Sequence, residues 1–169
     1  AGADVNKTRD VDGRTPLFTA AQKGHGEVVR ALMEAGADIN KATKKGATPL
    51  QVAAGKGDKA VMRALIEAGA DVNKASNDGG TPLVVAAQEG NEAVVRALFE
   101  AGAAINKTMN DGQTPLLVAA EKDHRAVVRA LIEACADSNT ARDECGKPLY
   151  LAAPKCHHAK WWAAIDGCP

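Results

Sequence analysis

The stretch Gly79-Gly80-Thr81-Pro82-Leu83-Val84-Val85-Ala86-Ala87 contains a pattern that recurs along the chain at one fixed spacing. The tripeptide Thr-Pro-Leu returns in steps of 33 residues, beginning at Thr15, Thr48, Thr81 and Thr114. Paired alanines keep the same register, at Ala20-Ala21, Ala53-Ala54, Ala86-Ala87, Ala119-Ala120 and Ala152-Ala153. A repeat of this length predicts a solenoid, in which each unit packs only against its neighbours.

The composition favours thin, closely packed helices. Apolar residues make up 46% of the 169 residues, but aromatic residues only 3%. The 21 basic and 21 acidic residues balance, which argues against a generally basic nucleic-acid binder. Apolar runs are short and interrupted, so no membrane span is expected. No signal-peptide pattern opens the chain.

Residues 1–6 match the end of a later repeat, residues 68–73, and no initiator Met precedes them. We therefore expect a fragment of a longer protein.

Each unit predicts two short helices. In the first full unit Thr15 is suited to cap a helix, and Pro16 to occupy its first position, where a missing N–H costs nothing. Gly24 is expected to end this helix in the left-handed conformation. A second helix is expected from about residue 27 to 35, with Gly36 as its stop. The polar residues that follow predict a hairpin-like loop before the next unit.

This pattern divides the chain into six segments. We expect the end of a truncated repeat and a loop at 1–11, four repeats at 12–40, 41–73, 74–106 and 107–139, and a degenerate terminal repeat at 140–169. The fourth repeat replaces two helix-stopping glycines, with Asp123 after its first helix and Cys135 after its second. In the last, Lys147 replaces the capping threonine and Pro154 falls late in the first helix.

With Thr-Pro-Leu, Ala-Ala, Gly-His, Val-Val and Gly-Ala-Asp-Val-Asn at this period, the chain resembles the ankyrin-repeat family. The resemblance covers essentially the whole chain, most strongly residues 12–139. It implies an all-α fold, an ankyrin-repeat solenoid of paired short antiparallel helices with projecting β-hairpin-like loops. The family's usual histidine after Thr-Pro-Leu is absent, and Phe18, Gln51, Val84, Leu117 and Tyr150 stand there. We expect its hydrogen bonds to be lost or replaced, and local stability to be lower for that reason.

The resemblance also implies where a partner would bind. In ankyrin-repeat proteins the hairpin tips and the first helices line a concave surface that holds another protein. Transferred by position, this gives candidate partner-binding residues Lys44, Lys45, Lys56, Asn77, Asp78, Gln88, Glu89, Asp111, Gln113, Glu121 and Lys122. The same transfer places Gln22 and Lys23 of the first full repeat on this surface. They differ between units in size and charge, as a recognition surface would. The alternative interpretation is that some are ordinary solvated residues.

Charge is distributed unevenly between the repeats. The second repeat has six basic and three acidic residues, whereas the third has two basic and four acidic residues. Such a gradient can orient a partner, since complementary charge sets approach and register more than affinity. A merely mixed, solvated surface is the alternative.

The last unit concentrates cysteine, histidine and tryptophan. Cys135 and Cys168 occupy equivalent positions, so about 8–10 Å should separate their backbones, too far for a disulfide. Reduced thiols predict an intracellular, reducing compartment, first the cytoplasm, with an organelle left open. Zinc-type ligands cluster here without zinc-site spacing, and we expect a diverged repeat rather than a metal site; they are Cys145, Cys156, His157, His158 and Cys168.

Two adjacent tryptophans invite opposite interpretations. Trp161 falls on an apolar core position of the other units, where it would seal the open end of the stack. Trp162 falls where the other units have arginine. It is either part of the same cap or an exposed partner-binding residue, a role in which tryptophan is enriched.

No catalytic pattern is present. The glycines are helix stops at the repeat period rather than a phosphate-binding loop, and His25 and His124 occupy the structural junction between helices. We therefore expect no catalytic residue, no cofactor and no nucleic-acid partner. The sequence predicts a non-catalytic protein–protein interaction module or scaffold, whose partner is another protein or a multi-protein assembly. Two alternatives are a structural subunit held end-on in a large complex and a regulatory segment of a longer enzyme.

Overall fold

The structure is a computed structural model. It describes the backbone of residues 2–138 and the side chains of residues 2–134. Residues 1–134 form one compact unit. The described residues contain eight helices and no strand, namely α1 (Pro16–Lys23), α2 (Gly26–Glu34), α3 (Pro49–Lys56), α4 (Lys59–Glu67), α5 (Pro82–Gln88), α6 (Glu92–Glu100), α7 (Pro115–Glu121) and α8 (Arg125–Ser138). The all-α repeat solenoid predicted from the sequence is confirmed.

The first helix of every described repeat begins in the same way. A threonine hydroxyl accepts a hydrogen bond from the backbone N–H three residues later, and proline follows directly. The donors and distances are Phe18 at 3.1 Å, Gln51 at 3.3 Å, Val84 at 3.3 Å and Leu117 at 3.1 Å. The predicted cap at Thr15 is therefore confirmed. So is the stop at Gly24, which has φ +72° and terminates α1.

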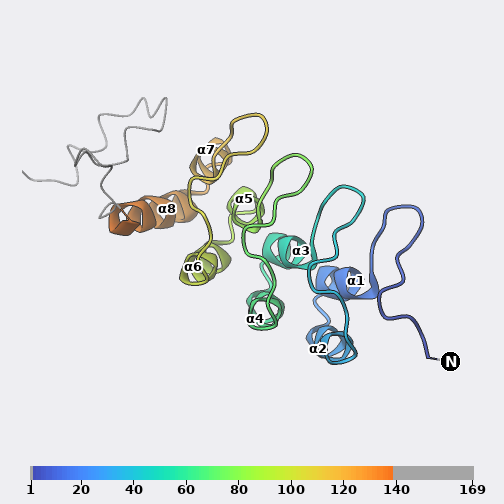
Figure 1. The fold of residues 1–169 in the computed structure, drawn as a ribbon. Coiled ribbons are helices and arrows are strands. Elements are labelled where there is room, and N and C mark those ends of the chain that lie inside the picture. The colour runs from blue at the N-terminus through green and yellow to red at the C-terminus, as the bar shows by residue number, and fades with distance from the viewer. Residues whose placement is uncertain (1, 139–169) are drawn as a thin grey trace, which may run out of the picture. The chain divides into compact units, whose positions relative to one another are not determined.

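The helices stack in two rows. First helices pack in succession, α1 on α3, α3 on α5 and α5 on α7, while α2 packs on α4 and α4 on α6 (Figure 1). The core between the rows is thin and aliphatic. Leu17, Leu50 and Leu83 are at most 1% exposed, and Val29, Met62 and Val95 are completely buried. Small alanines at the same register allow this close approach.

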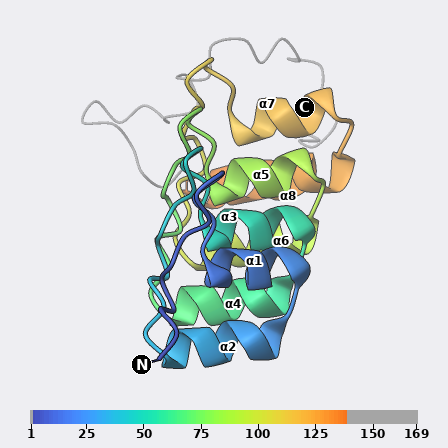
Figure 2. The ribbon, with the colours of Figure 1, turned by 90° about the vertical axis from the view of Figure 1, so that its right-hand side faces the viewer.

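The loops close as hairpins without forming strands, and they project on one side of the helices (Figure 2). One backbone hydrogen bond links each hairpin to the next, from Lys44 N to Asp12 O at 3.0 Å, from Asn77 N to Lys45 O at 3.0 Å, and from Asn110 N to Asp78 O at 2.9 Å. Gly79 allows this approach. It has φ +87°, and a Cβ there would lie 2.7 Å from the nitrogen of Asn110.

A second link between repeats uses asparagine side chains. The Asn40 amide donates to the carbonyl of Gly69 at 3.3 Å and accepts from the N–H of Asp71 at 2.9 Å. Asn6 and Asn73 make the equivalent pair of bonds one repeat before and one repeat after. The helix pairs α1/α2, α3/α4 and α5/α6 are therefore tied through polar backbone groups at their ends to the preceding segment.

The second repeat replaces the missing histidine with Gln51, which is 3% exposed. Its amide nitrogen donates to the carbonyls of Gly80, at 2.6 Å, and Lys74, at 3.1 Å. Its amide oxygen accepts from the N–H of Thr48 at 2.8 Å. Phe18, Val84 and Leu117 at the equivalent position have no polar side-chain atom to do this. The hydrogen bonds of the missing histidine are thus replaced in the second repeat and lost in the first, third and fourth. Both outcomes were expected from the sequence.

The fourth repeat differs at its two replaced glycines. Asp123 still adopts the left-handed conformation, with φ +56°. Cys135 does not end the second helix, as its alignment with Gly36, Gly69 and Gly102 suggested, because α8 continues to Ser138. Those glycines have φ between +83° and +93°. A residue with a Cβ is disfavoured there, and continuing the helix avoids that conformation.

Candidate protein-binding surface

The candidate residues of the second to fourth repeats lie on the hairpins and on the last turns of α3, α5 and α7 and the residues that follow. We call the side of the stack formed by the hairpin tips and the first helices the hairpin–helix surface (Figure 1). The structure places Lys44, Lys45 and Asp111 at exposed tips, and Lys56, Glu89 and Lys122 exposed at the ends of first helices. The repeat spacing therefore puts residues that are far apart in sequence at equivalent places.

Several of the candidate residues already have partners within the described residues. The Asn77 amide donates to the carbonyl of Lys44 at 2.9 Å, and the ammonium group of Lys44 donates to the carbonyl of Asp10. Asp111 accepts from the N–H of Gln113 at 3.0 Å. The Ser76 hydroxyl and then the Gly80 N–H hold the pKa of the Asp78 carboxyl below its ordinary value. These side chains shape the hairpins as well as lining them.

The remaining candidates extend into solvent. Their side chains make no hydrogen bond or ion pair with the part of the chain that the structure describes, and they are Lys45, Lys56, Gln88, Glu89, Glu121 and Lys122. These groups are available to a partner without breaking an internal contact. Gln113 is half-buried in its hairpin, and Trp162 lies outside the described residues.

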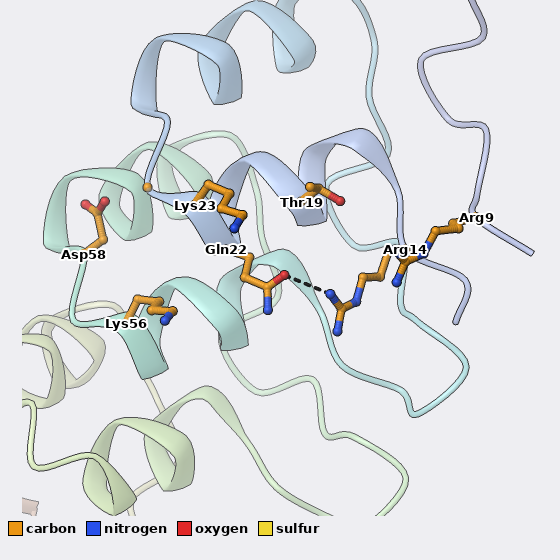
Figure 3. Close-up of a pocket in the computed structure, with 8 residues that line it drawn as sticks. Arg9, Arg14, Thr19, Gln22, Lys23, Lys56 and Asp58 are labelled. Atoms are coloured by element: carbon orange, nitrogen blue, oxygen red, sulfur yellow. Dashed lines mark hydrogen bonds between the residues drawn. The ribbon is translucent and has the colours of Figure 1, made fainter. Parts of the chain in front are cut away.

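A depression of about 800 Å³ lies between the first two repeats (Figure 3). It is lined by Arg9, Arg14, Thr19, Gln22, Lys23, Gly24, Lys56 and Asp58. These residues come from the first hairpin, from α1 and its end, and from the end of α3 and the junction that follows it. Sequence reasoning connected Gln22, Lys23 and Lys56 of this set with the partner-binding surface, but not the two arginines.

Arg14 is the most constrained side chain of this depression. Its Nε lies 3.0 Å from the carboxylate of Asp12, and its Nη1 donates to the amide oxygen of Gln22 at 3.0 Å (Figure 3). The guanidinium carbon is 5.5 Å from the centre of the Phe18 ring, within cation–π range. These three contacts fix the guanidinium group over α1.

Arg9 and Arg14 escaped the sequence-based prediction because the transfer of hairpin positions began at the second repeat, although the transfer of helix positions included the first. Their signal was nevertheless present. Arg14 directly precedes Thr-Pro-Leu, where Ala47, Gly80 and Gln113 stand in later repeats. A large cation at a position that is otherwise small or neutral marks the first repeat as different.

A second depression, of about 690 Å³, opens at the first repeat's outer side and includes Val28 and Leu32 of α2. Val28 is 48% exposed, whereas its equivalents Val61, Val94 and Val127 are at most 2% exposed. Leu32 is half-buried, although its equivalents are completely buried. Among the described residues, no helix pair packs against this apolar side of α2.

The structure gives the histidine at the last described junction a structural contact. His124 Nε2 lies 2.9 Å from the carbonyl of Gln88, near the end of α5. Among residues whose positions are described, no three His, Cys, Asp or Glu side chains are grouped to hold a metal ion. Cys145, Cys156, His157, His158, Trp161 and Cys168 lie outside them, so those predictions remain predictions. Over the same residues, no helix has the length and apolarity needed to cross a membrane.

Comparison with known proteins supplies the family. The family described as "Ankyrin repeats (3 copies)" matches residues 1–76, 36–109 and 83–161. The chain is 44% identical over 46 residues to "Ankyrin repeat domain-containing protein 40" of Mus musculus, which is 27% of this chain and 13% of that protein. The Homo sapiens protein of that name gives the same identity over 27% of this chain and 12% of its own length.

The match to these curated relatives thus spans about an eighth of their length. The family match, in contrast, extends over most of this chain, and the threonine caps, left-handed glycines and stacked helix pairs recur at its period. The chain belongs to the ankyrin-repeat family.

Proposed function

We propose that the protein is a non-catalytic protein–protein interaction module or scaffold that holds its partner on the hairpin–helix surface. The observation that supports this most is a fixed backbone with variable side chains. The same backbone bond joins Asn77 to Lys45 and Asn110 to Asp78, so Lys45 and Asp78 occupy equivalent places with opposite charges. A surface that is already ordered binds without a large ordering cost.

Family membership supports the same proposal. Ankyrin repeats are generally protein–protein interaction modules, and the family is typically non-catalytic. The partner is a protein or a multi-protein assembly rather than a nucleic acid, because acidic side chains such as Glu89 and Glu121 interrupt any basic strip along the stack.

The test is crosslinking mass spectrometry on the protein isolated gently from its source, with each crosslinked lysine assigned. Crosslinks from Lys44, Lys45, Lys56 and Lys122 to another protein are expected. Replacing Lys44, Lys45 and Lys56 by glutamate should then weaken capture of that protein. The control replaces Lys59 and Arg63 of α4, two exposed basic residues outside the candidate set, by glutamate. Unchanged capture by the first variant would contradict the proposal.

A structural subunit held end-on in a complex is the second candidate. Val28 of α2 is 48% exposed in the described residues, which supports it, because an apolar side chain at the end of a stack suits contact with a neighbouring apolar helix. This candidate expects crosslinks confined to Lys7 and to Lys155 and Lys160 of the last repeat. Replacing Val28 by aspartate should then release the protein from the assembly, while the lysine variants of the hairpin–helix surface should not.

A further inference from the structure

The depression between the first two repeats, defined above, contains more positive than negative charge. Arg9, Arg14, Lys23 and Lys56 line it, and Asp58 is its one lining carboxylate (Figure 3). One oxygen of that carboxylate accepts the N–H of Val61 at 3.0 Å and caps α4, and its single negative charge faces four basic groups. The depression therefore has basic groups in excess of the acceptors it offers them.

Two of these basic groups are unpaired. The ammonium groups of Lys23 and Lys56 have no hydrogen-bond or ion-pair partner in the part of the chain described. They end the first helices of successive repeats, so they are one repeat apart on the same side of the stack. The two arginines of the depression, in contrast to these lysines, already have an ion-pair partner, because Arg9 and Arg14 both pair with Asp12.

Arg14 still has capacity for an external acceptor. Its Nε lies 3.0 Å from the carboxylate of Asp12 and its Nη1 donates to Gln22, while its Nη2 has no partner among the described residues. Because these contacts and the Phe18 ring already hold the guanidinium group, binding an anion there requires little further ordering. Thr19 and Gln22 line the same depression. The Thr19 hydroxyl donates to the carbonyl of Thr15 at 3.1 Å and the Gln22 oxygen accepts from Arg14, so the amide nitrogen of Gln22 is the donor left for a peptide carbonyl.

We propose that this depression binds an acidic segment of a partner protein, with glutamate or aspartate side chains paired to Lys23, Lys56 and Arg14. The inference rests on the proposed function, since it names the chemistry of the partner at one part of the hairpin–helix surface. A peptide fits better than a nucleic acid. One repeat beyond Lys56 the equivalent residue is Glu89, which would repel a continuous phosphate backbone but tolerates a peptide whose acidic residues are confined to one end.

The test uses the full 169-residue chain and two fluorescently labelled 12-residue peptides. One contains four glutamates, and the other has glutamine at those positions. Fluorescence anisotropy should show the glutamate peptide binding more tightly, with affinity falling as salt rises. Replacing Lys23 and Lys56 by glutamate should weaken that binding about tenfold, because two attractive pairs become repulsive. Both side chains are exposed, so the fold should survive, which circular dichroism checks.

The matched control is the Lys59→Glu, Arg63→Glu variant, which changes net charge equally at α4, outside the depression. Its affinity for the glutamate peptide should remain close to that of the unchanged chain. Equal weakening by both variants, or equal binding of the two peptides, would overturn the proposal. So would displacement of the peptide by inorganic phosphate at equal concentration, or tighter binding of a single-stranded oligonucleotide.

The two proposals can fail separately. If crosslinks map a partner to Lys44, Lys45 and Lys122 but the glutamate peptide does not bind, the acidic-peptide inference fails and the proposed function stands. If the peptide binds at Lys23 and Lys56 but the native partner crosslinks only at the ends of the stack, the proposed function fails. The site would then remain an acidic-peptide site without that role.

Discussion

The first and second repeats use the same residues at equivalent positions but bury them differently. Val28 and Leu32 of α2 are 48% exposed and half-buried, respectively. Val61 and Leu65 of α4 are 2% and 0% exposed. The residue types are identical, so the difference comes from the neighbour, since α4 has α2 on one side and α6 on the other. Burial in this fold is a property of the boundary between repeats.

The largest effect is expected from two matched substitutions, of Leu32 in α2 and of its equivalent Leu65 in α4. Leu65→Ala should lower the free energy of unfolding by about 3 kcal/mol, because it leaves a cavity enclosed on all sides. Leu32→Ala should cost about 1–2 kcal/mol, because its side chain is only partly buried and solvent can occupy part of the space. Equilibrium urea unfolding followed by circular dichroism measures both.

The corresponding valine substitutions, Val61→Ala and Val28→Ala, independently test which position contributes more to stability. Val61→Ala should again lower the free energy of unfolding more than Val28→Ala. If the two leucine variants lost equal stability, burial at the repeat boundary would not determine the energetics, and the first repeat would have to be covered by some other contact.

The sequence predicted what is decided locally. Thr-Pro at the start of a helix and glycine after it act within a few residues, so the caps at Thr15 and Gly24 followed from the pattern. Cys135 was misjudged for a related reason. The period aligned it with a helix stop, but only glycine adopts that conformation readily, and the chain continued as a helix instead.

What the sequence could not reveal depends on contacts between repeats. Valine stands at both positions 28 and 61, yet Val28 is exposed to solvent and Val61 is buried. The Gln51 side chain is understandable only once the backbone of Lys74 and Gly80 is beside it. The basic depression combines a hairpin, α1 and the end of α3, so no single repeat contains its pattern.

Gln51 gives the next largest effect, at an inner boundary between repeats. Gln51→Leu should lower stability by about 1–2 kcal/mol, because the buried N–H of Thr48 and the carbonyl of Lys74 lose their side-chain partner. Thermal and urea unfolding measure the loss. Gln51→His, which restores the residue usual in the family, should retain most of the stability.

The control for this prediction is Gln88→Leu on α5, an exposed glutamine whose side chain has no partner among the described residues. It should change stability by less than about 0.5 kcal/mol. A Gln51→Leu protein as stable as the unchanged chain would show that the buried hydrogen bonds add nothing to that boundary.

The junctions after the first helices extend the comparison to the fourth repeat. Asp123→Gly should raise stability by about 0.5 kcal/mol, because φ +56° favours glycine. The reverse change at an inner junction, Gly57→Asp, should lower stability instead. Gly57 has φ +73°, and a Cβ there would lie 2.8 Å from the side-chain oxygen of Asn91. Urea unfolding of the two variants measures both signs, and a gain in both would contradict this account.

The smallest expected effect lies in the first hairpin, at the exposed end of the comparison. A hydrogen bond from Arg9, together with the Arg14 N–H, lowers the pKa of the Asp12 carboxyl from 3.8 to about 2. Since the folded-state pKa lies below the unfolded one, the contribution of Asp12 to stability is complete above pH 3.8 and is lost as the pH falls towards 2.

NMR titration of the Asp12 carboxyl carbon measures that midpoint directly. Arg9→Gln removes the largest cause, and should move the midpoint upwards towards 3.8 while leaving the helices unchanged. Asp12→Asn should weaken the pH dependence of unfolding between pH 2 and 3.8 and nowhere above it. A midpoint already near 3.8 in the unchanged chain would mean that Arg9 does not pair with Asp12 in solution. Arg9 would then be a further unpaired cation in the basic depression. The affinity for the glutamate peptide should then be higher than that expected from pairing with Lys23, Lys56 and Arg14 alone.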